Sequence, residues 1–454
     1  MKLGEHLTRY PLLDALIERR SRRFGEGMSL NGGPLAYDST HAPQPLSLEE
    51  EAALAFAGCG ITGFVLAELP YESGDTPEAG GGNIMTHFVG RTVASGDAMH
   101  NTTLFVLNDG GTWMLKRPQD YRREEIASLS QAAREHRLVE LYEKSRIRIA
   151  EERLDVPRKL PFVAPFNKWG ANLPGTTYFL PVAECSALYI NILLSAFGED
   201  FGYFVADERN RFKPPGIARF ARSKGGHLHD DPGEGRLATI GFLETWLYEF
   251  IAIEQGGMLQ NLALMTQALG LGGFPHFAAH PFIWFQTLGF RMQEIPFSRT
   301  IGAGPLTKRL MSVLGKDLPV PTAVGLEQDG ETLIKPFCPP YYRNMEEAVL
   351  AFVDYKYEQG KGTFRDGGDA TGWQDGARVQ AGIPTYSDEA IAATISYCEY
   401  VYERYGRFPA NSGPFRTVLA HQAHRLDPDF YERFYHSEAL TQTQGRHLPT
   451  QHYE

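Results

Sequence analysis

Four residues near the N-terminus have the types and the spacing to bind an anion. The segment ERRSRRF, Glu18 to Phe24, places arginines on both sides of a serine, and its candidate ligands are Arg19, Arg20, Ser21 and Arg23, here called the N-terminal cluster. Guanidinium groups bind phosphate oxygens in a fork geometry, and a hydroxyl adds a further donor. Basic runs at helix ends are more commonly solvated faces or partners of the helix dipole. The segment alone therefore leaves both interpretations open.

Two turns could bring backbone close to a ligand. The first, here called the serine loop, precedes an expected strand and consists of Ser95, Gly96 and Asp97. The second, here called the glycine turn, follows an apolar helix and consists of Gly270, Leu271, Gly272 and Gly273. Glycine lets backbone approach a ligand, but Gly270 is equally a natural helix C-cap. Asp97 is as consistent with a turn residue as with a ligand contact.

Two segments carry histidine and aspartate at spacings that permit metal ligation. They are HLHDD, His227 to Asp231, and HQAHRLD, His421 to Asp427. Such groups are common on polar loops, and on a helix His421 and His424 would equally form a packing cluster. The four cysteines contain no CxxC pair, so a thiolate zinc site or an iron–sulfur cluster lacks ligands at the usual spacing, and buried thiols are expected. We predict no metal site.

Helices with marked ends must position the N-terminal cluster. Apolar residues from Leu12 to Ile17 recur with helical spacing and predict a helix that ends at the cluster. Ser47 and Glu50 have the spacing of a capping box at the start of a second helix. A later helix is predicted over Ser387 to Tyr405, with Gly406 as its C-cap.

A buried helix and a hairpin are predicted next to the two turns. Gly256 to Leu269 is apolar on nearly every side, which is typical of a helix inside the core. The pattern around Thr103 to Leu107 predicts a strand, a turn at Asn108 to Gly111 and a second strand.

The composition limits the classes of function. The chain has 454 residues, 43% hydrophobic and 22% charged, which is typical of a soluble globular protein. A formal net charge of −11 without a basic stripe argues against nucleic-acid binding. We find neither a secretory leader nor an apolar run long enough to span a bilayer, so we expect a cytoplasmic protein without a membrane partner.

Four segments, in this order, resemble the nitroreductase family of FMN-dependent oxidoreductases, and specifically its branch that oxidises azoline rings in modified peptides. They are Glu18 to Phe24, Gly90 to Pro118, Gln260 to Gly273 and Lys335 to Val349. The resemblance implies an α+β fold with a central, mostly antiparallel sheet flanked by helices. The FMN domain would span 1–356 with an insertion at about 121–253, and a C-terminal extension, 357–454, would pack on it.

The same resemblance assigns the candidate residues to FMN. The N-terminal cluster would hold the phosphate, with Arg343, or alternatively Lys335, as a closing cation. The serine loop would border the pyrimidine side of the ring, and amides of the glycine turn would lie near its N5 atom. A homodimer is implied, with sites shared between subunits.

The implied activity is alternate reduction and reoxidation of the flavin with a small-molecule or peptide-derived substrate. NADH or NADPH is the candidate reductant. The cofactor carries this chemistry, so no catalytic side chain is assigned. The alternative is a protein of the same fold that binds or sequesters flavin without turnover.

Two further segments are expected to shape the site. In 199–236, aromatic and basic residues alternate, which predicts either a lid over the flavin or an ordered surface insertion. The tail after Lys356 is too rich in aromatics and specific turn residues for disorder, so we expect it to fold against the flavin domain and narrow the mouth of the site.

Overall fold

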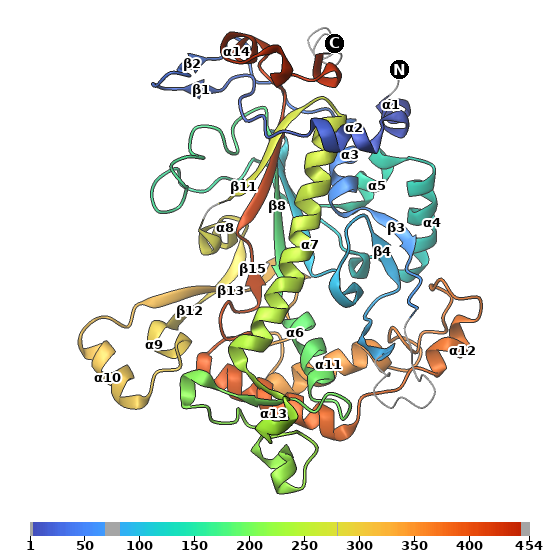
Figure 1. Cartoon of the computed structure of the whole chain (residues 1–454), viewed down its shortest axis with the longest axis vertical. Coiled ribbons are helices and arrows are strands. Elements are labelled where there is room, and N and C mark those ends of the chain that lie inside the picture. Colours follow the sequence, from blue (N-terminus) through green and yellow to red (C-terminus); the bar gives the residue numbers. More distant parts are fainter. Residues whose placement is uncertain (1–2, 69–81, 279, 446–454) are drawn as a thin grey trace.

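One antiparallel sheet organises the chain in the computed structural model, which describes residues 3–68, 82–278 and 280–445 (Figure 1). Its strands follow the order β11, β16, β8, β5, β6 and β7, and the short β15 also pairs with β8. Every pair in this sheet is antiparallel. The strands are β5 (Thr102–Asn108), β6 (Gly111–Leu115), β7 (Arg146–Ala150), β8 (Thr177–Glu184), β11 (Gly272–Phe277), β15 (Phe415–Arg416) and β16 (Leu419–His424). The predicted α+β class with a central antiparallel sheet is confirmed.

Both faces of the sheet are covered, as the alternation along β5 requires. Leu104 and Val106 pack with α3 (Leu48–Cys59) and α7 (Ile240–Ala268) on one face. Phe105 and Leu107 pack on the other face with α8 (Pro281–Thr287) and the paired strands β12 (Phe290–Pro296) and β13 (Pro319–Gln328). Side chains of a strand point alternately to opposite faces, so the apolar run Leu104 to Leu107 of β5 serves two cores.

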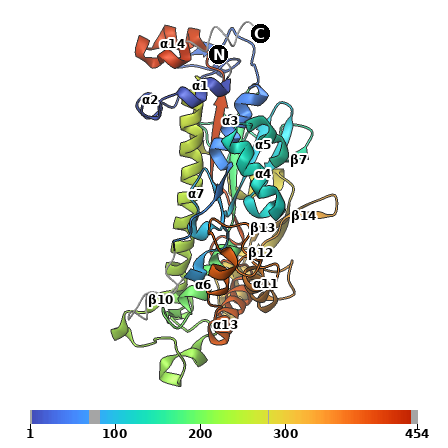
Figure 2. The same ribbon diagram turned by 90° about the vertical axis from the view of Figure 1, so that its right-hand side faces the viewer.

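The longest helix, α7, runs along the sheet through the middle part of the molecule, from near α13 up to α2 (Figures 1 and 2). Thr239 caps its start by accepting a hydrogen bond from the Phe242 N–H. The apolar pattern predicted a start at Gly256, but Gly256 and Gly257 lie inside the helix. A Cβ on Gly257 would lie 2.5 Å from Val93 Cγ2, so this glycine allows the segment before the serine loop to pack closely on α7. In the described part of the chain, no helix is long and apolar enough to cross a membrane.

Smaller sheets surround the central one. Three antiparallel strands form an arm that also carries the short helices α9 and α10 (Figure 1). The arm consists of β12 (Phe290–Pro296), α9 (Phe297–Thr300), α10 (Pro305–Val313), β13 (Pro319–Gln328) and β14 (Glu331–Ile334). The two-stranded sheets are β1 (Ser29–Leu30) with β2 (Tyr37–Asp38), β3 (Ile61–Phe64) with β4 (Val89–Arg91), and β9 (Phe204–Ala206) with β10 (Leu237–Thr239).

Locally encoded elements appear where the sequence places them. The capping box of Ser47 and Glu50 opens α3, and the β5–β6 hairpin turns at Asn108 to Gly111. Gly406 closes α13 (Asp388–Tyr405) in the left-handed conformation, with φ of 74°. The remaining helices are α1 (Leu3–Arg9), α2 (Leu12–Glu18), α4 (Arg123–Arg134), α5 (Leu138–Ser145), α6 (Ser186–Ala196), α11 (Met345–Tyr357), α12 (Gly376–Ala381) and α14 (Pro428–Phe434). All four cysteines are free and buried, as expected.

The segments expected to be an insertion and an extension both supply strands to the central sheet. β7 and β8 lie within 121–253, and β16, from the tail, lies between β11 and β8. His421 and His424 therefore lie on a strand, where their spacing puts them on opposite faces, and not on a helix.

The lid candidate 199–236 is bonded to the rest of the chain. Its buried Asp207 accepts 2.7 Å hydrogen bonds from the hydroxyls of Tyr400 and Tyr405 on α13. Arg219 also donates to Ser396 Oγ of the same helix, at 3.3 Å. These contacts are those of an ordered surface segment docked on α13.

Candidate functional site

The N-terminal cluster begins where α2 ends. Arg20 donates from Nη1 to the carbonyl oxygens of Ile17 and Arg19, at 2.9 Å each, and so satisfies the free carbonyls at this helix end. Arg20 and Ser21 are exposed and Arg19 is half-buried. The side chains of Arg19 and Ser21 form no hydrogen bond with the described residues, so both remain available to a ligand.

Arg22, which the sequence interpretation did not select, fixes this segment to the sheet. Its carbonyl accepts from the Gly273 N–H at 2.9 Å, which places the segment beside the edge strand β11. Its guanidinium is 4% exposed and donates to Gln267 Oε1 of α7 at 3.0 Å and to the Ala439 carbonyl at 2.6 Å. In an extended segment, alternate residues face opposite sides, so Arg22 anchors the segment while Ser21 and Arg23 share the other side.

Arg23 is the half-buried donor of the cluster. Its guanidinium lies 4.7 Å from the ring centroid of Phe274 and 5.0 Å from that of Trp169. Nη2 donates to the Phe166 carbonyl at 2.8 Å and to Asn167 Oδ1 at 3.1 Å, whereas Nε is buried without a partner among the described residues. Burial lowers the pKa of Arg23, but an arginine keeps its charge. A buried donor without a partner is uncommon and is explained by a ligand or a water molecule.

The glycine turn lies against this cluster, but its amides are largely engaged within the chain. The Gly270 and Leu271 N–H groups cap α7 through the carbonyls of Gln267 and Thr266, at 3.0 Å each. A Cβ on Gly272 would lie 2.7 Å from His424 Nε2, and one on Gly273 would lie 2.5 Å from the Gln422 carbonyl oxygen. These two glycines are therefore required by the close approach of β16.

The serine loop is held by a buried carboxylate of α7. Glu254 accepts from Ser95 Oγ at 3.1 Å, from the Thr102 N–H at 3.0 Å and from both nitrogens of Asn101. It also pairs with Arg91, and neither side chain of this pair is more than 1% exposed. Buried charges are stable only when paired and hydrogen-bonded in this way.

Asp97, at the end of the serine loop, belongs to a second buried network. Its carboxylate accepts from Asn191 Nδ2 at 3.0 Å, and Asn191 Oδ1 accepts from Lys356 Nζ at 2.8 Å. Burial raises the pKa of Asp97 to about 6 and lowers the pKa of the fully buried Lys356 well below its usual value. A carboxyl group that titrates near neutrality beside a buried amine is a common feature of functional sites.

The serine loop, a predicted ring contact, and the N-terminal cluster, the predicted phosphate contact, do not meet within one subunit. Glu254, which holds the serine loop, and Gln267, which holds Arg22, are 13 residues apart on α7. At 1.5 Å of rise per residue, this is a separation of about 20 Å. Arg343 is 90% exposed, pairs with Glu347 and lies beside α11, away from α2 (Figure 1). The alternative cation, Lys335, lies 4.1 Å from the ring centroid of Tyr342 on the wall of a small cavity.

Part of this arrangement fits FMN and part does not. The donor chemistry of Arg19, Ser21 and Arg23 suits a phosphate dianion, because it offers a hydroxyl and unpaired guanidinium N–H groups. The serine loop, which was expected beside the ring, lies elsewhere in the same subunit. Of the predicted site, the N-terminal cluster and the glycine turn lie together within one chain.

A separate cleft of about 330 Å³ opens between α11 and the segment around β4. His87 and Tyr355 line it and are hydrogen-bonded to each other. Burial lowers the pKa of His87 to about 4, so its imidazole is neutral at physiological pH. Ionisable groups line the same cleft, including Arg123 at the start of α4 and Lys361 and Asp366 in the segment after α11.

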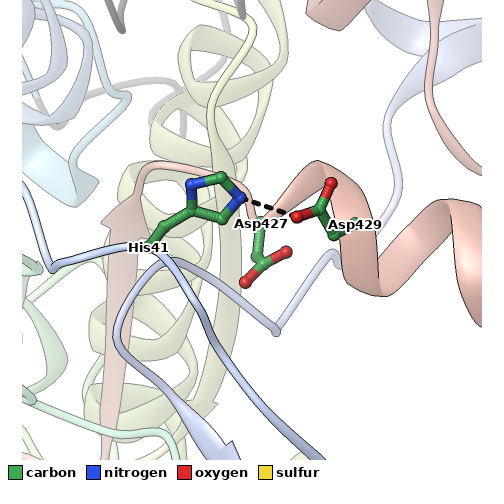
Figure 3. A group of neighbouring side chains, drawn as sticks. All are labelled: His41, Asp427 and Asp429. Atoms are coloured by element: carbon green, nitrogen blue, oxygen red, sulfur yellow. Dashed lines mark hydrogen bonds and ion pairs between the residues drawn. The ribbon is translucent and has the colours of Figure 1, made fainter.

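One group of side chains in the described part of the chain has the arrangement of metal ligands. Potential ligand atoms of His41, Asp427 and Asp429 lie within 4.8 Å of one another (Figure 3). Asp427 already caps α14 by accepting from the Phe430 N–H at 3.0 Å, and it accepts from Ser39 Oγ at 2.5 Å. His41 and Asp429 form a 3.0 Å ion pair if the histidine is protonated. These contacts explain the group as a tie between the 39–41 segment and α14.

Comparison with known proteins gives little further information. No protein-family model and no curated protein matches the chain. A crystal structure from Ralstonia eutropha, described as a "putative nitroreductase", is 12% identical over 62% of this chain and 75% of its own, with a TM-score of 0.30. A likeness at this level assigns neither fold nor function.

Two functional candidates carried signals that sequence reasoning could have used. Arg22 belongs to the ERRSRRF motif. If this segment is extended, the side chain of Arg22 points to the side opposite to those of Ser21 and Arg23, which gives it a different role. Lys356 follows Ala348 and Phe352 at four-residue spacing, on the buried stripe of α11. A lysine on such a stripe is rarely buried without specific partners.

Proposed function

We propose that the protein is an FMN-dependent oxidoreductase of the nitroreductase type. The observation that supports it best is Arg23, a half-buried residue whose Nε has no partner among the described residues. In the same segment, the side chains of Arg19 and Ser21 form no hydrogen bond within the described chain. These donors suit the phosphate, while Arg22 and the glycine turn hold the segment in place. Bound FMN would supply hydride acceptance and return of electrons to a second substrate. NADH or NADPH is the proposed reductant.

We further propose that the working unit is a homodimer, in which the partner supplies the serine loop beside the ring. Four large apolar side chains of α2 are more than half exposed: Leu12, Leu13, Leu16 and Ile17. Phe250 and Ile253 of α7 are 37% and 62% exposed, and α7 lies along an outer edge of the molecule (Figure 2). Packing of two α7 helices in opposite directions would bring the serine loop of one copy toward the N-terminal cluster of the other. The antiparallel packing would thus bring together two parts of the site that lie far apart along α7 within one subunit.

The cofactor is tested by the visible spectrum of gently purified protein and by its FMN content. We expect a flavin spectrum and about one FMN per subunit, because a single cluster is present in each chain. The Arg19→Ala, Arg23→Ala double variant should lose FMN, and Arg343→Ala is the matched control that should retain it. Undiminished FMN in the double variant would reject the phosphate site.

Turnover is tested separately by anaerobic addition of NADH or NADPH to the flavin-loaded protein. An oxidoreductase should bleach with a reductant and recover its colour with an electron acceptor. FMN that stays bound but is not reduced by NADH or NADPH, and that undergoes no cycle of reduction and reoxidation with an acceptor, would instead identify a flavin-binding protein.

A further inference from the structure

A second cavity, of about 70 Å³, lies behind the wall of the His87 cleft. Gln119 and Tyr355 line both spaces, so they form the partition between this inner cavity and the outer cleft of about 330 Å³. A water molecule takes about 30 Å³ of liquid, so the inner cavity has room for two waters or for one small planar group.

Two carboxamide oxygens on the inner wall have no hydrogen-bond partner among the described residues. Gln119 Nε2 donates to the carbonyls of Met99 and His100, at 3.3 and 3.2 Å, and Asn101 Nδ2 donates to Glu254 at 3.3 Å. These bonds fix which end of each amide is nitrogen. Gln119 Oε1 and Asn101 Oδ1 are therefore acceptors, and both are buried and unpaired. Asn101 is only 2% exposed, so bulk water does not satisfy its oxygen.

The same cavity also offers donors. Arg117 binds Asp120 through Nε and Nη2, at 3.1 and 3.0 Å, which leaves its Nη1 without a partner among the described residues. Lys335 lines the cavity as well and forms no ion pair within the described chain. Glu184, the acidic residue of the wall, already accepts from the N–H groups of Ser186 and Ala187. The wall of the inner cavity therefore offers a ligand two acceptor oxygens, from Gln119 and Asn101, and N–H donors from the cations Arg117 and Lys335.

We propose that the inner cavity binds the primary carboxamide group of a small molecule whose apolar or aromatic part extends into the outer cleft. The amide NH₂ would donate to Asn101 and Gln119, and its carbonyl would accept from Arg117 or Lys335. In the outer cleft, Phe88, Tyr121 and Tyr355 supply aromatic wall for the attached group. This site does not depend on the proposed flavin.

Neither charged analogue of the amide matches the same wall. A carboxylate has no N–H to satisfy the two unpaired oxygens, and it would face Glu184. An ammonium group would satisfy the oxygens but would face Arg117 and Lys335 without offering them an acceptor. A neutral primary amide carries both a double donor and an acceptor, and so it meets both requirements.

The proposal is tested with three probes that share one ring: benzamide, benzoate and benzylamine. Their binding to the full-length protein is measured by ligand-observed saturation-transfer NMR, with a crystal soaked in benzamide as the structural readout. We expect benzamide to bind tightest, with its carboxamide at Asn101 and Gln119. Gln119→Leu should weaken benzamide binding by about tenfold, because the amide loses a buried acceptor.

Lys335→Met provides a variant that does not disturb the core, because Lys335 is an exposed residue. It should weaken benzamide binding, whereas Lys316→Met, the same change at an exposed lysine outside the cavity, should leave it unchanged. Benzoate or benzylamine binding as tightly as benzamide would overturn the proposal. It would also be overturned by equal benzamide affinity in all variants, or by a soaked crystal with only water at the two oxygens.

Discussion

At the scale of residues, the molecule depends on a few buried charges that hold distant segments together. Glu254 receives hydrogen bonds from the serine loop and from the start of β5, and pairs with Arg91. Its oxygens thereby connect the long helix, the loop and the sheet. Asp97 differs from Glu254 because its hydrogen-bond partner, Asn191, is neutral and the cation that stabilises its charged form, Lys356, is itself buried. The protonation state of the Asp97 carboxyl group therefore changes with pH.

We predict that Asp97→Asn removes a pH dependence of stability. Burial raises the pKa of Asp97 from 3.8 to about 6, so the folded protein keeps this proton where the unfolded chain has lost it. The stabilisation is present at about pH 4 and is lost as the pH rises through about 6. Relative to wild type, the variant should gain on the order of 2 kcal/mol in unfolding free energy between about pH 5 and pH 8. Urea unfolding at both pH values measures this difference.

Asp329→Asn is the matched control for that experiment. Asp97 and Asp329 both have positive φ, 55° and 52°, a conformation that asparagine also tolerates, but Asp329 is exposed in a turn. The control should show no such pH-dependent gain. A constant difference between Asp97→Asn and wild type at every pH would show that Asp97 does not titrate in this range.

At the scale of elements, two short helices have apolar faces that the subunit does not cover. α2 buries only Ala15, and α10 buries none of its residues. α2 lies beside α7, next to the N-terminal cluster, whereas α10 lies on the arm at the other end of the molecule (Figure 1). Exposed apolar faces of this size usually mark contact surfaces.

We predict that the α2 face is the dimer contact. The double change Leu13→Glu, Leu16→Glu places charges on this face, whose side chains are 65% and 51% exposed in the subunit. Burying them at an interface would then be unfavourable, so the variant should be monomeric. Light scattering measures the mass, and the control is Leu306→Glu, Leu310→Glu on α10. A dimer that persists in the α2 variant, or that is lost only in the α10 variant, would refute this placement.

At the scale of the whole molecule, the C-terminal segment contacts both the central sheet and the N-terminal segment. β16, from the last part of the chain, lies inside the sheet and pairs with both β11 and β8. Beyond it, the carbonyl of Ala439 accepts from Arg22, and Thr441 accepts from Gln267. The described ends of the chain lie close together at the top of the molecule (Figure 1). The tail therefore contributes to the core and to the support of the N-terminal cluster.

We predict that two truncations behave differently. Ending the chain after Lys356 removes β16 and α13, which leaves β8 and β11 without their shared neighbour, and should give no cooperatively folded protein. Ending it after Tyr435 keeps the sheet and removes contacts outside it, including those to Arg22 and Gln267, so this protein should fold. Circular dichroism during heating distinguishes the two. A cooperative melt of the shorter protein would contradict the role of β16.

The sequence by itself determined the elements whose hydrogen bonds are local. The capping box at Ser47, the turn at Asn108 to Gly111 and the C-cap at Gly406 are each specified within a few residues, and all appear as predicted. Apolar periodicity also separated individual helices from strands, because the apolar spacing of a helix differs from that of a strand. The α+β class itself came from the resemblance of four segments to a known family.

Only the tertiary structure decided what depends on contacts between distant segments. The spacing of His421 and His424 was compatible with a helix. In the structure, His421 pairs instead with Pro275 of β11 and Phe179 of β8, so the segment is a strand. Likewise, the arginine motif indicated donors for a phosphate, but the packing of the chain separated an anchoring Arg22 from an available Arg23 and placed Arg343 beside another helix. The physical reason is that strand pairing and burial depend on the partners that folding brings together, which local spacing does not specify.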